Sequence, residues 1–585
     1  MPRPAGRAAR DLLARRKDAA NRLRREVLGA DGSLGHPYFR ALERRLAQER
    51  PRRVPLDRIF RKCLAARLVY VGDFHAVPAC QEFAADLLAR LRAAGPVALG
   101  VEFVYARQQG VLDRRQSGGM DDASFLRRIH YREEWGYPWR GYGEMLDRAR
   151  ELAVPVVALD SPPRAGFEGL ARRDEHVARR IAARLCSSPG ERLLVLIGES
   201  HLAPGHLPAS VGRRLSRLGS GVEAVTVFQS PDAPYWRLLA ARDEPPEAAA
   251  LGSGAFAVFH TPPIAKYEAY RQVLERWRED VPPDEEVDLT PAVHHLVGVL
   301  LGWLGIDPER HRIRHRGGWA EDLADAFPEV YSGPEAKALL GPILAEHGSS
   351  AAESREARSA LEARGALYEP RSNTVFLLRY LPGRAAGEGA RFLRAALSGR
   401  LFSAAEEPAA GPVERAYAAA YEEGLAYLGS LLVDPAGDYL LPDDRRALAA
   451  AGGRSAPRGG TAWALRDRWL AAHLRFEAGG SWTVPEEIAG YLRGARGVRR
   501  ALARDLGHRL GWALFERVRR GDLGERELRS LFSRPLAPAR SSRAVVGLLR
   551  GDRGPSEEKP GPRPAARPRV AGRGRWVKES SRPRK

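Results

Sequence analysis

The first half of the chain alternates short apolar runs with amphipathic helical patterns. The apolar runs end near Val71, Phe103, Leu159, Ile197 and Phe228. Between these runs, apolar residues recur with the spacing that places them on one face of a helix. Strands and helices that alternate in this way form βαβ units, which build a mostly parallel sheet with helices on both faces. We therefore predict an α/β domain over residues 54–285.

The pattern changes beyond about residue 285. Long Ala-, Leu- and Arg-rich segments follow, such as residues 412–432, and one strand pattern is present at residues 373–381. Apolar residues at helical spacing over segments of this length favour helices over strands. The sequence thus predicts a mainly helical second domain over residues 286–550, to which it assigns no chemistry.

The formal net charge of the 585-residue chain is +21, and most of it lies at the two ends. Residues 1–53 carry about +9, and we expect them to form a basic N-terminal arm that is partly helical. Residues 551–585 carry about +7 and are rich in Pro, Gly and Arg, so we predict a disordered basic tail. Such a tail either keeps the chain in solution or makes weak, sequence-independent contacts with polyanions.

The rest of the composition is that of an ordinary globular protein, with 44% hydrophobic and 29% charged residues. The N-terminal segment is basic but lacks the apolar stretch of a signal peptide, and no lipoprotein-type cysteine follows it. The longest apolar run, residues 294–306, is too short to cross a bilayer. The three cysteines show neither zinc-binding nor redox spacing. We expect a cytoplasmic protein and leave open whether it forms a homodimer.

Two of the predicted strands end in the same order of residue types: Gly, an acid, any residue, His. Residues 72–75 read Gly-Asp-Phe-His, and residues 198–201 read Gly-Glu-Ser-His. A third strand ends with Glu102, and a fourth ends with Asp160, whose Ser-Pro-Pro neighbours are more typical of a turn. Because the carboxyl ends of parallel strands meet at one edge of a sheet, we predict that the two motifs and Glu102 share one site.

Two imidazoles and a carboxylate form a common shell for a divalent metal ion with open positions for water. His75, Glu102 and His201 are therefore candidate metal ligands, and these three together with Glu199 are candidate catalytic residues of a hydrolase. Asp73 or Glu199 would orient or deprotonate the attacking water. Either histidine by itself has a simpler interpretation as a structural residue bonded to a carbonyl group. The joint pattern favours a functional site.

The segment at residues 131–146, Tyr-Arg-Glu-Glu-Trp-Gly-Tyr-Pro-Trp-Arg-Gly-Tyr-Gly-Glu-Met-Leu, is unusually aromatic. Aromatic side chains in such a segment either pack as a lid over the core or clamp a flat ligand. The sequence by itself favours neither interpretation.

Together these motifs resemble those of the ChaN-like haem-binding uptake family of the Tiki/erythromycin-esterase-like superfamily. The resemblance spans roughly residues 60–260 and rests on the two G-x-x-H motifs, Glu102 and the segments at residues 106–128, 139–162 and 198–208. It implies an α/β sheet fold with helical insertions. The first motif departs from the family's usual Gly-Glu-x-His, because its acid is an aspartate.

The resemblance implies two functions of different classes. As in ChaN-like members, the domain would bind haem and take part in haem or iron handling, with Tyr105, Tyr137, Trp139 and Tyr142 as candidate cofactor-binding residues. As in Tiki-like members, it would be a metal-dependent hydrolase of ester or peptide bonds that uses the two motifs, Glu102 and a divalent metal. Haem binding is our first hypothesis, with haem or another small molecule as the expected partner, and the hydrolase is the alternative.

Overall fold

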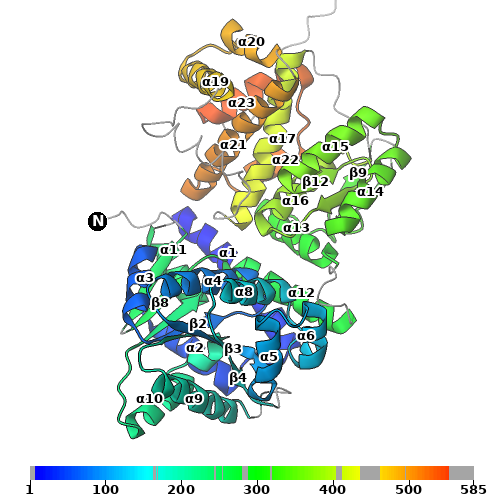
Figure 1. The fold of residues 1–585 in the computed structure, drawn as a ribbon. Coiled ribbons are helices and arrows are strands. Elements are labelled where there is room, and N and C mark those ends of the chain that lie inside the picture. Colours follow the sequence, from blue (N-terminus) through cyan, green and yellow to red (C-terminus); the bar gives the residue numbers. More distant parts are fainter. Residues whose placement is uncertain are drawn as a thin grey trace, which may run out of the picture.

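The structure is a computed structural model, and it describes residues 7–162, 167, 169–242, 245–252, 254–279, 288–315, 319–402, 411–434, 461–493 and 496–551. It consists of an α/β region followed by a mainly helical region, which confirms the predicted fold class (Figure 1). No helix in the described part of the chain is both long enough and apolar enough to cross a membrane. The predicted basic tail lies, from residue 552 onward, outside the described residues.

The α/β region is built on an eight-stranded sheet with the strand order β1-β7-β8-β6-β2-β5-β3-β4. The strands are β1 (Arg52–Arg53), β2 (Leu68–Asp73), β3 (Val97–Tyr105), β4 (Val156–Asp160), β5 (Arg192–Gly198), β6 (Ala224–Gln229), β7 (Ala248–Gly252) and β8 (Ala255–Val258). From β8 to β4 all neighbouring strands in this order pair in parallel, whereas β7 is antiparallel to β8 and β1. The five apolar runs of the sequence form β2 to β6, so the sheet is mostly parallel, as predicted.

Helices cover both faces of the sheet. They are α1 (Arg7–Ala30), α2 (Pro37–Gln48), α3 (Leu56–Ala65), α4 (Pro78–Ala93), α5 (Gln109–Gln116), α6 (Asp122–Ile129), α7 (Tyr131–Glu134), α8 (Trp139–Glu151), α9 (Leu170–Ser187), α10 (Leu207–Arg217), α11 (Asp232–Arg242) and α12 (Pro263–Glu279), with the 3-10 turns η1 (Ala106–Gln108) and η2 (Glu199–Leu202). Successive strand side chains point to opposite faces. On one face Val69 and Val71 therefore pack with α3, α4 and α8, and on the other Leu68 and Tyr70 pack with α2, α9 and α10.

The connections change direction across the sheet between β2 and β5. The chain runs from β2 through α4 to β3 on one side of this strand pair, and from β5 through α10 to β6 on the other side. The two connecting helices lie on opposite faces of the sheet. In open α/β sheets, ligands bind in the crevice that such a switch opens at the carboxyl ends of the strands. The two G-x-x-H motifs begin here, at the ends of β2 and β5.

Residues 7–48, expected to belong to a partly helical basic arm, form α1 and α2 and pack onto the rest of the chain. Helix α1 buries Leu12 and Leu23 in a core that it shares with α11 and α12. Helix α2 buries Leu42 and Leu46 against the sheet. Both helices have basic residues on their outer faces and apolar residues within the core.

The helical region contains α13 (Thr290–Leu304), α14 (Gly333–Glu346), α15 (Ala351–Arg364), α16 (Pro382–Leu397), α17 (Pro412–Val433), α19 (Thr461–Ala478), α20 (Glu486–Arg493), α21 (Arg496–Arg520), α22 (Glu525–Ser533), α23 (Ser541–Arg550) and the turn η3 (Pro538–Arg540). It also contains an antiparallel pair, β9 (Arg312–Arg314) and β10 (Ala320–Asp322), and a three-stranded sheet of β11 (Glu329–Ser332), β13 (Thr374–Leu377) and β12 (Ala366–Glu369). Strand β13 lies within the predicted strand at residues 373–381.

Small residues allow the central helices of this region to approach closely. A Cβ atom on Gly511 of α21 would lie 2.6 Å from the carbonyl oxygen of Gly424 in α17. A Cβ atom on Gly429 of α17 would lie 2.5 Å from that of Ala390 in α16. These distances are too short for any larger side chain, so the packing of α16, α17 and α21 depends on glycine at these positions.

Helix α1 joins the two regions. The Arg16 guanidinium is buried and donates hydrogen bonds to the carbonyl oxygens of Leu432 and Leu431 at the end of α17, at 3.1 and 2.5 Å. Arg15 donates to the carbonyl oxygen of Gly302 in α13 at 3.0 Å. The apolar core of the helical region continues through α1 to α11 and α12. The same helix therefore contacts the second region and, as shown below, lines the candidate site.

Candidate functional site

A cavity of about 1730 Å³ lies at the carboxyl edge of the sheet. The ends of β2, β3 and β5 contribute to its lining, together with α1, α2, α7 and the turn after it, α11 and α12. Its position is the crevice that the switch between β2 and β5 creates. The four candidate catalytic residues, His75, Glu102, Glu199 and His201, all line this cavity.

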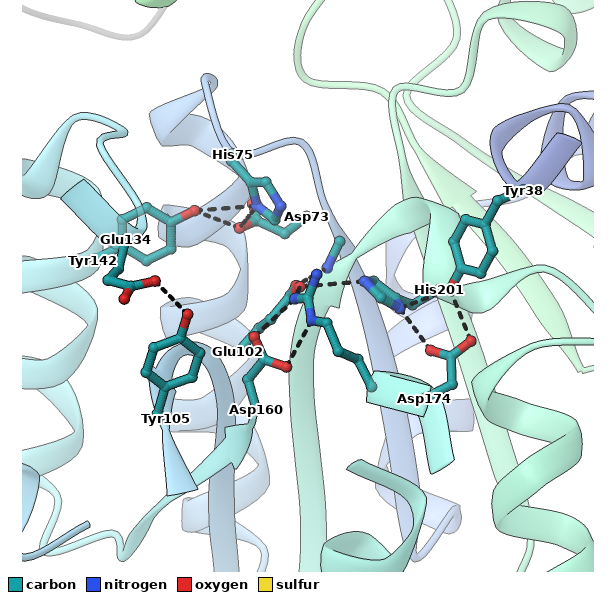
Figure 2. Close-up of polar contacts among 12 residues, drawn as sticks. Tyr38, Asp73, His75, Glu102, Tyr105, Glu134, Tyr142, Asp160, Asp174 and His201 are labelled. Atoms are coloured by element: carbon teal, nitrogen blue, oxygen red, sulfur yellow. Dashed lines mark hydrogen bonds and ion pairs between the residues drawn. The ribbon is translucent and has the colours of Figure 1, made fainter. Parts of the chain in front are cut away.

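His75 is held by one of its two ring nitrogens (Figure 2). Its Nδ1 lies 2.8 Å from Oδ2 of Asp73, which also accepts a hydrogen bond from the Tyr142 hydroxyl at 2.7 Å. The other oxygen of Asp73 accepts a hydrogen bond from Gln81 at 2.6 Å. A carboxylate at Nδ1 fixes the tautomer that carries its proton there and leaves the lone pair on Nε2.

The Nε2 atom of His75 faces Glu102 across Gly198, the last residue of β5. A Cβ atom on Gly198 would lie 3.1 Å from Nε2 of His75 and 3.3 Å from Oε2 of Glu102. The absence of a side chain at Gly198 therefore lets an imidazole and a carboxylate lie close to each other against the backbone of β5. Both groups also line the cavity, so a small group bound there, such as a water molecule or one reacting atom of a substrate, would meet them together.

Glu102 is buried and is fully engaged by hydrogen bonds. Oε2 accepts a bond from the backbone N–H of Gly198 at 2.6 Å, and Oε1 accepts one from Arg173 at 2.8 Å. Arg173 also binds both oxygens of Asp160, at 2.9 and 2.8 Å. Asp160 is thus part of a buried ion-pair network, in addition to ending its strand.

His201 lies on the other side of Glu102 and is bonded through both nitrogens. Its Nε2 lies 3.3 Å from Oε1 of Glu102, and its Nδ1 lies 2.6 Å from Asp174. The Tyr38 hydroxyl lies 2.8 Å from both Asp174 and His201 Nδ1, and the Tyr38 ring stacks on His206 with centroids 3.9 Å apart. Figure 2 shows this chain of contacts from α2 through α9 to the sheet edge.

Glu102 and His201 stabilise each other's charge. Burial by itself would raise the pKa of Glu102, but His201, His75 and Arg173 outweigh it and hold the pKa well below its usual value. Burial would likewise lower the pKa of His201, but Glu102 and Asp174 raise it to about 9. At neutral pH the site therefore contains an imidazolium between two carboxylates.

Glu199 takes part in a separate contact on the α12 side of the cavity. The Lys266 side chain, only 3% exposed, lies 3.2 Å from Oε1 of Glu199 and 3.6 Å from Asp232. Its ammonium group also lies 4.4 Å from the centroid of the Phe74 ring. Burial raises the pKa of Glu199, and Lys266 opposes that shift in part. Glu199 thus shares the cavity with His75 but belongs to a different ion pair.

The four candidate cofactor-binding aromatic residues have different environments. Tyr137 lines the cavity, and its ring lies 4.9 Å from that of His75. Tyr105 is buried and donates its hydroxyl hydrogen to Glu134. Trp139 packs in the core and donates to Asp122 at 2.9 Å, and Tyr142 is bonded to Asp73 as described above. Of the four, only Tyr137 is among the residues that line the cavity.

Within the described ranges, no group of three or more His, Cys, Asp and Glu side chains is arranged to hold a metal ion. The predicted ligands His75, Glu102 and His201 are close together, but both nitrogens of His201 already have carboxylate partners. Their role as metal ligands stays a prediction.

Sequence reasoning missed four residues that complete the site. Arg173 and Asp174 lie in α9, Tyr38 in α2 and Lys266 in α12, and all but Tyr38 are at least nine-tenths buried. In sequence, the charged residues of these helices look like ordinary solvated helix faces. The pattern contains no signal that would have identified them, because only the packing of the helices shows which charges point inward.

The family model described as "Haem-binding uptake, Tiki superfamily, ChaN" matches residues 59–168. This segment of the chain is ChaN-like. The match confirms the resemblance over the first G-x-x-H motif, Glu102 and the aromatic stretch, whereas the second motif at residues 198–201 lies beyond it. No curated protein sequence matches the chain.

Three solved structures are similar to parts of this chain. ChaN of Campylobacter jejuni, whose structure shows cofacial haem binding, is 10% identical, with 31% of this chain and 87% of that chain covered and a TM-score of 0.23. The type III effector HopBA1 is 15% identical, with 36% and 96% covered and a TM-score of 0.26. The C-terminal region of Pasteurella multocida toxin, with a thiol-protease-like catalytic triad, is 12% identical, with 33% and 26% covered and a TM-score of 0.21.

Proposed function

We propose that the α/β region binds haem, or a similarly large, flat and anionic ligand, in the cavity at the sheet edge, and that it serves haem or iron handling. The observation that carries this proposal is the cavity itself, at about 1730 Å³, because pockets for drug-sized ligands are about 300–1,000 Å³. Aromatic and basic side chains line it, which suits a flat ring system with acidic substituents. The ChaN match over residues 59–168 supports the same ligand class.

The residues present fit haem through Tyr137. A tyrosine is an established type of axial ligand to haem iron. Tyr137 lines the cavity, where its hydroxyl is hydrogen-bonded to that of Tyr270, whereas the hydroxyl groups of Tyr105 and Tyr142 are bonded to the carboxylates of Glu134 and Asp73. His75 is less suited to this role, because its Nδ1 is bonded to Asp73 and its Nε2 lies close to Gly198 and Glu102 at the sheet edge. Bound haem would supply the redox and Lewis-acid chemistry of its iron.

Titration of the purified full chain with haemin, followed by the Soret absorption band, tests this proposal. We expect saturable binding with a shifted Soret maximum, and a different maximum in Tyr137→Phe because the phenolic oxygen is lost. Tyr421→Phe is the matched control, since the Tyr421 hydroxyl is buried in the helical region and donates to the Leu531 carbonyl. Wild-type protein with no Soret shift would contradict the proposal.

Hydrolysis of an ester or peptide bond is a second candidate function. The observation that favours it is the convergence of His75 Nε2 and Glu102 on the space beside Gly198. The Asp73–His75 pair presents an imidazole lone pair to this space, as a general base requires. A water molecule there would be activated by His75, and the imidazolium of His201 would stabilise the charge of Glu102. A divalent metal bound by His75, Glu102 and His201 is the metal-dependent form of this hypothesis.

A further inference from the structure

Helix α12 carries three aromatic residues on the side that lines the cavity. Tyr267, Tyr270 and Trp277 are spaced by three and then seven residues, which places them on one side of a helix. This helix follows the ChaN-matched segment by almost a hundred residues in sequence. The family match therefore assigns nothing to it.

Phe74 and Tyr137 add to this row to form an aromatic surface, in which the Tyr137 and Tyr270 hydroxyl groups are hydrogen-bonded. The Phe74 ring contacts the rings of Tyr267 and Tyr270 edge to face, with centroids 6.0 and 5.7 Å apart. The Tyr137 ring contacts that of Trp277 edge to face at 5.2 Å. The surface reaches from the end of β2 to Trp277, which is 43% exposed.

Hydrogen bonds fix the polar groups of Tyr267, Tyr270 and Trp277. The Tyr267 hydroxyl donates to Asp232 at 2.5 Å, and the Tyr270 hydroxyl donates to Asp31. Nε1 of Trp277 donates to the carbonyl oxygen of Gly136 at 3.0 Å. Rings fixed in this way lose little conformational freedom when a ligand packs against them, and this preorganisation favours binding.

The indole of Trp277 packs closely against Gly136. Gly136 has a φ of 71°, and a Cβ atom there would lie 2.5 Å from Nε1 of Trp277. Glycine therefore satisfies both the backbone conformation and the close approach of the indole. The indole is held in place and yet leaves much of its surface in water, which is unfavourable for a group of this size. A flat ligand that packs against it would remove this surface from water.

We infer that α12 supplies the face on which a flat aromatic ligand packs, and that Trp277 is a ligand-contacting residue that sets specificity for such ligands. The inference rests on the proposed function and deepens it. The flat face of the haem would pack against α12, and Tyr137 would be the axial ligand of its iron. It predicts that the aromatic character of residue 277, rather than its bulk alone, determines affinity.

The test is a haemin titration of the full chain with Trp277→Leu and Trp277→Phe. We expect the Leu variant to bind haemin roughly ten-fold more weakly, because stacking and buried aromatic area are both lost. The Phe variant should stay within about three-fold of the wild type, because it keeps a ring in this place. The Soret maximum at saturation should be unchanged in both variants. Trp512→Leu is the matched control, since Trp512 is 47% exposed on α21 in the helical region.

Thermal unfolding of each variant checks that the fold is retained, which we expect because Trp277 lies at the protein surface. Equal haemin affinities of Trp277→Leu and the wild type would overturn this inference and leave the proposed function intact. An equal loss in the Leu and Phe variants would overturn the assignment of specificity to the aromatic face. A wild-type chain without any Soret shift would overturn the proposed function and this inference together.

Discussion

Tyr38 and His201 are 163 residues apart in the sequence, and the hydroxyl of one lies 2.8 Å from Nδ1 of the other. Asp174 bonds both side chains, so that one residue of α2 and one of α9 orient the imidazole that faces Glu102. The N-terminal helices are thereby part of the candidate site. Because Asp174 and Glu102 stabilise the protonated form of His201, the free energy of unfolding should depend on the pH range in which His201 loses its proton.

The free energy of unfolding should fall as the pH rises from about 6.5 to about 9. The pKa of His201 is raised to about 9 in the folded protein, mainly by Glu102 and Asp174, whereas an unfolded histidine titrates near 6.5. A raised folded pKa contributes stability that is complete below about pH 6.5 and is lost as the pH rises through the folded value. The loss should amount to at most about 3 kcal/mol.

Asp174→Asn should reduce this slope, because the amide cannot stabilise the imidazolium as the carboxylate does. Urea unfolding at pH 6, 7.5 and 9 measures the effect. Tyr38→Phe removes one hydroxyl and should change the slope less than Asp174→Asn. An unchanged slope in Asp174→Asn would contradict the assignment of the titration to His201.

Gly198→Ala should separate the two candidate functions. The new methyl group would lie 3.1 Å from His75 and 3.3 Å from Glu102, and so crowd both side chains. We expect any hydrolysis of activated esters to fall by about a hundred-fold, because the methyl group would push His75 and Glu102 away from the attacking water. Haemin affinity should change less, since the atoms nearest to the new methyl group belong to His75 and Glu102 and not to Tyr137. Gly205→Ala is the control, because a Cβ atom there meets nothing within 4 Å.

His75→Ala should leave the haemin Soret shift unchanged if Tyr137 provides the iron ligand. The same change should abolish hydrolysis, by about a hundred-fold or more, if His75 is the general base. Absorption titration and ester turnover on one protein preparation give both answers. A lost Soret shift in His75→Ala, with the fold intact by circular dichroism, would instead make His75 the haem ligand.

Gly511→Ala should destabilise the helical region by about 1–3 kcal/mol, because its methyl group would lie 2.6 Å from the Gly424 carbonyl oxygen in the facing helix. Gly490→Ala in α20 is the control, since a Cβ atom at that position contacts nothing within 4 Å. This control should be neutral or slightly stabilising, by up to about 1 kcal/mol, because alanine favours helix. Denaturant unfolding monitored by circular dichroism measures both.

The sequence by itself determined the sheet and the place of its chemistry. Short apolar runs that alternate with helical patterns favour the strands of a parallel sheet, whose carboxyl ends share one edge. The positions of His75, Glu199 and His201 on one cavity follow from that rule, because they come just after the ends of β2 and β5. Glu102 was predicted to end its strand but lies inside β3, which continues to Tyr105, and it reaches the cavity from within that strand.

Only the tertiary structure decided which other side chains complete the site. Tyr38, Arg173 and Lys266 come from amphipathic helices, whose sequence fixes a buried face but not the element that the face meets. The aromatic stretch at residues 131–146 shows the same limit, because core packing and ligand contact demand the same residue types. Tyr137 and Trp139 both pack against the same core, but packing placed only Tyr137 of these two in the cavity wall. The physical reason is that strand ends are positioned by local hydrogen-bonded pairing, whereas a helix is positioned by non-local contacts that no local pattern encodes.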